Sequence, residues 1–189
     1  MTALVHHGTA IRFVCDQLWN SIHDEIGTVE DDRAERLRVS VLPVVPGASI
    51  ILACSYLERC VFELKQTVPD SRLQANEQIP NVAELREWQR YFSLPVPWDG
   101  WYELSNFFRI RHCFAHEFGR ATDRQKRHIE SFLLELQNGS VREEGTVIDP
   151  YFILVNDEIS MLEGWNHRLR QRTVGFLRLF DAHGFRLTQ

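Results

Sequence analysis

The feature that most limits the fold of this chain is a long apolar segment in its first half. From about Ala48, IILACSYLERCVFELKQTV has the length of a helix and carries apolar residues around most of its circumference. A helix of this kind needs neighbours on several sides, so the segment predicts a central helix within a bundle. Pro43 and Pro46 interrupt the apolar stretch that leads into it, and Glu58 and Arg59 lie within it. We therefore expect a core helix and not a membrane span.

Apolar residues at helical spacing continue through most of the remaining chain. They mark further helices at about residues 11–26, 82–94, 101–118, 122–137 and 169–180. Residues that start helices stand at the expected places, with Asn81 and Glu84 as a capping box and Asp99 ahead of the next helix. Gly119 follows the end of that helix, and Thr122 opens the one after it.

One short segment near the C-terminus predicts strands. VIDPYFILV and EISML flank Asn156 and Asp157, a pair typical of the two-residue turn of a β-hairpin. The length of 189 residues suits one domain, which we expect to cover residues 1–189. The fold class that we predict is all-α, a helical bundle of about five helices with a small β-hairpin before the C-terminal helix.

Charge and cysteine content exclude some classes of protein. A net charge of −5 argues against a protein that coats nucleic acid without specificity, although it leaves room for a local basic cleft. The four cysteines are scattered and form no C-x-x-C pair, so we expect buried thiols in a reducing compartment. MTALVHHGTAIRF lacks a basic region followed by an apolar run. We therefore expect no signal peptide and a cytoplasmic location.

The segment RIRHCFAHEF, residues 109–118, places two arginines and two histidines within a helix whose other residues predict that it is buried. On a helix, His112 and His116 are neighbours one turn apart, and Arg109 lies on nearly the same stripe. Residues 109–128 hold six lysines or arginines against two acidic residues, which predicts a local positive patch in an acidic protein. We assign Arg109 and Arg120 from this patch to substrate binding, because such a patch attracts phosphate.

The sequence Arg111-His112-Cys113-Phe114-Ala115-His116 resembles the signature of the HEPN superfamily, in which an arginine, a polar residue and three further residues precede a histidine. SYLERCVFEL, with Glu58, resembles the family's helix that bears an acidic residue, and the late hairpin and last helix also fit. The resemblance implies a helical bundle that acts as a metal-independent ribonuclease, as in toxins and phage-defence effectors. It also implies RNA as substrate, a homodimer in which two motifs line one cleft, and an antitoxin protein as a further partner.

The chemistry of RNA cleavage suits these residue types. Attack by the RNA's own 2′-hydroxyl needs a group that removes its proton and a group that protonates the leaving oxygen, and histidine does both near neutral pH. An arginine can neutralise the charge that builds on the phosphate, so this route requires no metal or cofactor. The resemblance makes His116 the acid or base, Arg111 the phosphate clamp and His112 a polar support.

The chain departs from the family pattern at two positions. Arg109 is also at a permitted spacing from His116, but we favour Arg111 because the polar His112 follows it, whereas an apolar residue follows Arg109. In some HEPN toxins a tyrosine stands two residues after the histidine, where a partner enzyme modifies it. Phe118 occupies that position here, which argues against regulation of that kind.

Other interpretations of the same residues stay open. The charged stripe can be a solvated helix face, and Glu58 can serve either an ion pair within the bundle or the orientation of His116 or Arg111. Zinc binding by His112 and His116 is disfavoured, because Cys113 points to another face and no further ligand is evident. The alternative functions are a non-catalytic module that binds RNA, nucleotide or a protein partner, and a purely structural dimerisation domain.

Overall fold

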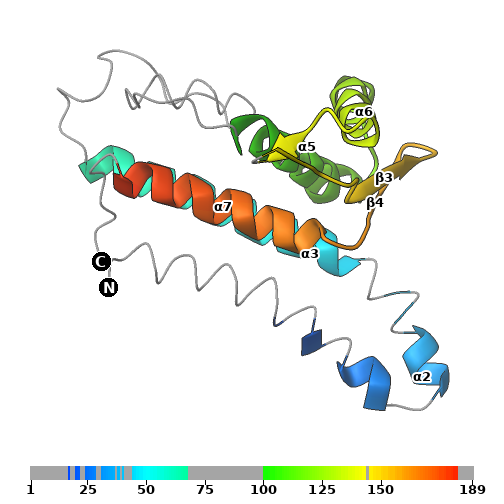
Figure 1. Ribbon diagram of the computed structural model, residues 1–189. Helices are drawn as coiled ribbons and strands as arrows, with labels where there is room; N and C mark the ends of the chain where they lie inside the picture. Colours follow the sequence, from blue (N-terminus) through cyan, green and yellow to red (C-terminus); the bar gives the residue numbers. More distant parts are fainter. Residues whose placement is uncertain are drawn as a thin grey trace.

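The computed structural model describes residues 17, 20–21, 24–28, 31–36, 38, 40, 44–67, 100–143 and 145–182, without the side chains of 64–67. In this part of the chain helices predominate, which confirms the predicted all-α class (Figure 1). The elements are α2 (Asp31–Arg36), α3 (Val44–Thr67), α5 (Gly100–Glu117), α6 (Asp123–Gln137), β1 (Arg142–Glu143), β2 (Thr146–Val147), β3 (Phe152–Val155), β4 (Glu158–Met161) and α7 (Trp165–Ala182). The helix predicted at 82–94, and most of the one predicted at 11–26, lie outside the described residues.

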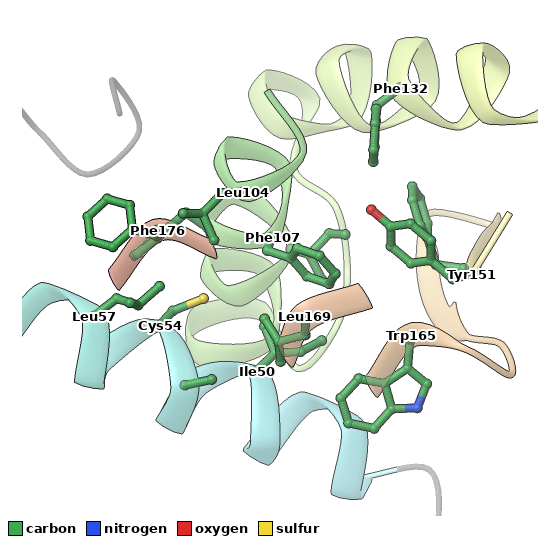
Figure 2. Packing of buried hydrophobic residues seen from close by; sticks show 14 of the residues in the cluster. Ile50, Cys54, Leu57, Leu104, Phe107, Phe132, Tyr151, Trp165, Leu169 and Phe176 are labelled. Carbon is green, nitrogen blue, oxygen red and sulfur yellow. The ribbon is translucent and has the colours of Figure 1, made fainter. Parts of the chain in front are cut away.

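Helices α3, α5 and α7 pack against one another and form the core, and α6 packs on α5. Figure 1 shows α7 running alongside α3. Side chains from all three helices meet in the interior, as Figure 2 shows for Leu57 of α3, Phe107 of α5 and Phe176 of α7, and all three are fully buried. The prediction that the apolar segment forms a helix packed by neighbours is therefore confirmed. Residues Val44–Glu63 are long and apolar enough to cross a membrane, and 56% of this span is buried inside the protein, as in a core helix.

The start of α3 differs from the prediction. The helix begins at Val44 and includes Pro46, whereas the proline-marked break predicted a start near Ala48. Pro46 lies in the first turn, where its missing N–H has no partner within the helix to lose, so proline fits there without breaking the helix. Its fixed φ angle is also close to the helical value.

The predicted ends of α5 and α6 are confirmed. Beyond Glu117 the backbone turns through Phe118 (φ 52°) and Gly119 (φ 91°), the left-handed conformation that often follows a helix. Thr122 precedes α6 with extended backbone angles (φ −70°, ψ 160°), although its side chain makes no capping hydrogen bond. At the other end of α6, Gly139 has a φ of 65°, in agreement with the predicted stop.

The hairpin at Asn156 and Asp157 is also confirmed, with β3 and β4 paired antiparallel. The two turn residues have φ angles of 52° and 68°, and positive values at both positions define the turn that asparagine and aspartate favour. This hairpin joins the end of α5, because the Ile159 N–H donates to the Gly119 carbonyl (2.9 Å) and the Ala121 N–H to the Asp157 carbonyl (2.7 Å).

A second small hairpin, β1–β2, corrects the prediction that strands occur only at about residues 147–162. Its strands have two residues each, which is too short for an alternating pattern to be visible in the sequence. Gly145, with a φ of 84°, lies in the turn between them.

Candidate functional site

His112 and His116 form a pair of exposed imidazoles near the C-terminal end of α5. Their ring centroids are 4.6 Å apart and the rings are tilted by 48°. The pair follows from helical spacing, because residues four apart lie one above the other on one face. Neither ring forms a hydrogen bond with another residue that the structure describes, and both residues are exposed, so a ligand can reach them.

Arg111 and Glu58 come together from two helices that are adjacent in the core. The Arg111 Nη1 atom donates to Glu58 Oε1 at 2.7 Å, and the two side chains are 25% and 29% exposed. The Arg111 guanidinium also lies 6.0 Å from the centre of the Phe108 ring. Its Nε is buried without a hydrogen-bond partner among the described residues. Glu58 thus holds one branch of the guanidinium and leaves other donors unused.

Arg109 lies in different surroundings from Arg111. Its Nη1 donates to Asn106 Oδ1 at 3.0 Å, and its side chain is half-buried. Burial lowers the pKa of Arg109 from its usual range, but an arginine stays charged at neutral pH. Close by, the Tyr102 hydroxyl donates to Glu135 Oε1 of α6 (2.9 Å). The structure therefore places Arg109 toward α6 and Arg111 toward α3.

A groove of about 610 Å³ lies beside the end of α5, between the start of α3 and strand β4. Its lining is mainly apolar and includes Phe114, Ile159 and Met161. Phe114 fits closely against the backbone of α3, because a Cβ atom added to Gly47 would lie 2.6 Å from the Phe114 ring. A glycine at position 47 is what allows this approach.

Phe118 is one of the residues that line this groove, and its position differs from the one that helical spacing predicts. By helical spacing it belongs with Phe107 and Phe114 on the apolar side, but α5 ends at Glu117 and the chain turns. As a result the Phe118 side chain is 97% exposed, the most exposed large apolar residue among those described.

The predicted positive patch is smaller than its sequence suggests. Lys126 forms ion pairs with Asp157 (2.5 Å) and Glu130 (4.0 Å). Arg120, Arg124 and Arg127 are exposed, and none of them forms an ion pair with a residue that the structure describes. We call these three residues the arginine row. They lie between the end of α5 and the first two turns of α6.

The zinc interpretation gains no support from the geometry. Cys113 is fully buried, and burial raises the pKa of its thiol to about 11, whereas a zinc ligand has to be a thiolate. Among the described residues, no three histidine, cysteine or acidic side chains gather as a metal site.

Sequence reasoning missed a buried charged cluster at the other end of α5. Glu103, 2% exposed, binds Arg168 Nη2 at 2.6 Å and Arg172 Nε at 2.5 Å. Glu143 of β1 closes the cluster by accepting from Arg168 Nη1 (2.6 Å) and Arg172 Nη1 (3.0 Å). The signal was present in WYELSNFF, where one acidic residue stands among apolar ones, as Glu58 does in its helix.

This buried cluster lines one side of a second cavity of about 720 Å³. Arg168 and Gln171 line this cavity, but their side-chain N–H groups donate hydrogen bonds to Glu143 or Glu103. The Tyr151 hydroxyl, which has no hydrogen-bond partner among the described residues, also lines this cavity. Comparison with protein families, curated proteins and solved structures gives no match.

Proposed function

We propose that this protein is a metal-independent endoribonuclease of the HEPN type, with its active site at the C-terminal end of α5. The observation that supports the proposal most directly is the exposed imidazole pair of His112 and His116, with 4.6 Å between ring centroids, on the helix that also carries Arg111. An exposed imidazole with a polar neighbour, on a helix that also carries an arginine, is the kind of side-chain set that acid–base catalysis at a phosphate uses.

In the proposed reaction, the 2′-oxygen of the RNA attacks the adjacent phosphorus and the bond to the 5′-oxygen breaks. His116 takes the 2′-hydroxyl proton or gives a proton to the leaving 5′-oxygen. His112 is in ring contact with His116 and supports it as the neighbouring polar group. The products are a 2′,3′-cyclic phosphate and a free 5′-hydroxyl. His116 carries one of these two proton transfers and solvent water exchanges the other proton, so the proposed route uses no metal-bound hydroxide.

Arg111 stabilises the phosphate in this proposal, and Glu58 acts as a positioning residue. The guanidinium is held through Nη1 by Glu58 at 2.7 Å, which fixes its direction; Nε is buried, so Nη2 is the group left for a phosphate. A preorganised cation aimed at developing charge is the most effective electrostatic form of catalysis. Arg109 and Arg120 contribute to substrate binding as flanking cations.

The proposal also covers the oligomeric state, the location and the biological role of the protein. One subunit supplies one arginine–histidine set, and we propose a homodimer in which two sets line a shared cleft. We place the protein in the cytoplasm as a toxin or phage-defence effector, with an antitoxin protein as a further partner.

One observation favours a second candidate, a non-catalytic module that binds RNA, nucleotide or a protein partner. Arg111 already has a carboxylate partner in Glu58, so its role as a clamp requires it to share or exchange that partner. A module that only binds RNA needs no such exchange, because the arginine row and Arg109 can hold phosphates by themselves.

The test is cleavage of a labelled RNA by wild-type protein, His116→Ala and His167→Ala. His167 is an exposed histidine of α7 and serves as the matched control. We expect His116→Ala to lower the cleavage rate by about 10²-fold, the typical worth of positioned acid–base catalysis, and His167→Ala to leave it unchanged.

Product analysis and chelation separate this chemistry from others. We expect cleavage to persist in EDTA and to leave 2′,3′-cyclic phosphate ends. Loss of cleavage in EDTA, or full activity in His116→Ala, contradicts the proposed chemistry. Binding of RNA without cleavage by wild-type protein supports the second candidate instead.

A further inference from the structure

We propose that Phe118 stacks against an unpaired base of the substrate and that the arginine row holds the phosphates next to it, so that the substrate class is single-stranded RNA. The identity of the strand as RNA rests on the proposed function. The stacking subsite itself rests on the exposure of Phe118, the apolar groove beside it and the distribution of charge around both.

The first observation is how the chain presents Phe118. The side chain is 97% exposed, and its φ angle of 52° is a conformation in which bulky residues are uncommon. Glycine or asparagine normally occupies this place after a helix. The backbone on both sides is fixed, because Gly119 N–H donates to the Cys113 carbonyl and Arg120 N–H to the Glu117 carbonyl, each at 3.0 Å. A backbone of fixed conformation thus presents an aromatic ring to solvent.

The second observation is the shape and chemistry of the groove at which Phe118 stands. Phe114, Ile159 and Met161 give it an apolar lining, its volume is about 610 Å³, and Phe118 is one of its lining residues. A flat, partly apolar molecule can lie against the ring and along this lining. Nucleobases have this form, and stacking of one base on an aromatic side chain contributes roughly 1–3 kcal/mol.

The third observation is the charge beside the groove. Glu158 lines the groove, and its carboxylate repels a phosphate placed there. The backbone of Arg120 pairs with that of Glu158, which places Arg120 beside the groove, and Arg124 and Arg127 continue the arginine row along α6. A strand with one base in the groove therefore has these arginines as nearby cations for its phosphates. A duplex cannot do so, because its bases are stacked inside the helix.

A second copy of the chain docked on Phe118 itself, as distinct from the proposed homodimer around the imidazole pair, fits this surface less well. In a two-fold contact centred on Phe118, the same patch of both subunits meets, so each arginine row would lie near its counterpart. Like charges placed opposite each other cost binding energy. A nucleic acid instead offers negative charge along the row. The charge pattern therefore favours a polyanion.

The experiment measures binding in the His116→Ala protein, which keeps the RNA intact. A fluorescent single-stranded oligoribonucleotide, the same strand paired to its complement, and a strand with one abasic position serve as probes. We expect Phe118→Ala to weaken single-strand binding by roughly 5- to 100-fold, the equivalent of the loss of one stacked base. Phe118→Trp, which keeps an aromatic face, should restore it. Phe62→Ala is the matched control, since Phe62 is a 55% exposed phenylalanine on α3.

Two further measurements test whether Phe118 itself contacts the single strand. We expect Phe118→Ala to leave duplex binding unchanged, and a strand with 4-thiouridine to crosslink to Phe118 on irradiation. Circular dichroism checks that each variant is folded. If Phe118→Ala binds the single strand as tightly as the protein that keeps Phe118, the proposed subsite is wrong. It is also wrong if Phe118→Ala changes the association of subunits, measured by sedimentation, and leaves RNA binding unchanged.

The outcome also separates this inference from the proposed function. If wild-type protein binds single strands through Phe118 but never cleaves them, the subsite holds and the nuclease proposal fails. If wild-type protein cleaves RNA and Phe118→Ala cleaves and binds it equally well, the nuclease proposal holds and the subsite fails.

Discussion

The two ends of α5 carry the same kind of chemistry at different degrees of burial. At the N-terminal end, Glu103 and its arginines Arg168 and Arg172 are 3%, 11% and 8% exposed in their side chains. Toward the C-terminal end, Arg111 and Glu58 are 25% and 29% exposed, and the imidazole pair beyond them lies in solvent. One helix therefore joins an arginine–carboxylate cluster inside the protein to another at its surface.

The two clusters differ in how many hydrogen-bond partners their charged side chains have. Glu103 Oε1 accepts from Arg168 Nε at 2.9 Å, and Oε2 accepts from both arginines. Glu143 takes up further donors, so the cluster closes on itself. Arg111 instead has one hydrogen-bonded branch and an Nε without a partner among the described residues. A closed cluster fixes the fold, whereas an open one can take a ligand.

The largest expected effect is on stability, from Glu103→Gln. Removal of this carboxylate leaves two buried arginines with one remaining acidic partner, and breaking a buried pair typically lowers the free energy of unfolding by about 3–5 kcal/mol. Urea denaturation measures it. Glu130→Gln removes an exposed partner of Lys126, and this control should change stability by less than about 1 kcal/mol. A similar small effect in both variants would remove the distinction between closed and open clusters.

The next effect is on catalysis, from Arg111→Ala. We expect the cleavage rate to fall by about 10²-fold, because removal of one donor that stabilises developing charge costs roughly that much. Arg111→Lys should recover only part of it, since the planar fork is lost. The control is Arg59→Ala, which breaks a more exposed ion pair with Glu63. If Arg109→Ala lowers the rate and Arg111→Ala does not, Arg109 is the motif arginine.

A smaller effect is expected from Glu58→Gln, which frees the Nη1 atom of Arg111 from its carboxylate. Because Glu58 competes with phosphate for the same cation, the variant should bind inorganic phosphate about threefold more tightly, or about 0.7 kcal/mol. It should cleave RNA more slowly, since the guanidinium loses its fixed direction. Calorimetry and rate measurements test the two parts separately. Weaker phosphate binding would show that Glu58 supports Arg111 without competing with phosphate.

The smallest effect concerns pH. Burial by itself raises the pKa of Glu143, but the hydrogen bond from Arg168 and the charges of Arg172 and Arg168 outweigh it and lower the pKa below its usual value of 4.5. A carboxyl whose pKa is lower in the folded state stabilises the protein above its unfolded pKa and loses that contribution as pH falls through the folded value. Stability should therefore fall below about pH 4.5, and less steeply in Glu143→Gln. Denaturation curves of both proteins at pH 7, 5, 4 and 3 measure this, and parallel losses would contradict it.

The sequence predicts the local parts of this structure well. The helices α5, α6 and α7, the stop at Gly119 and the Asn156-Asp157 turn follow from spacing and from residues with special backbone preferences. The imidazole pair of His112 and His116 follows from helical geometry in the same way. These features depend on residues close together in the chain, and such residues determine local conformation.

Features that join distant segments were not predictable in the same way. The contact between Glu58 and Arg111 links residues 53 apart, and that between Glu103 and Arg172 links residues 69 apart. An acidic residue in an apolar helix indicates that a partner exists but not which cation supplies it. The position of Phe118 was missed for a related reason, since helical spacing applies only where the helix continues.

The function stays a prediction. The resemblance to HEPN proteins supplied the hypothesis for it.

The close approach of Phe114 to Gly47 limits the order in which this protein can change during evolution. A methyl group at position 47 would lie 2.6 Å from the aromatic ring, and one at position 119 would lie 3.0 Å from it. An alanine at position 47 is therefore disfavoured while the phenylalanine is in place. It becomes tolerable once a smaller side chain stands at 114. The two sites are epistatic, and a lineage that reshapes the groove has to change the ring first and the glycine second.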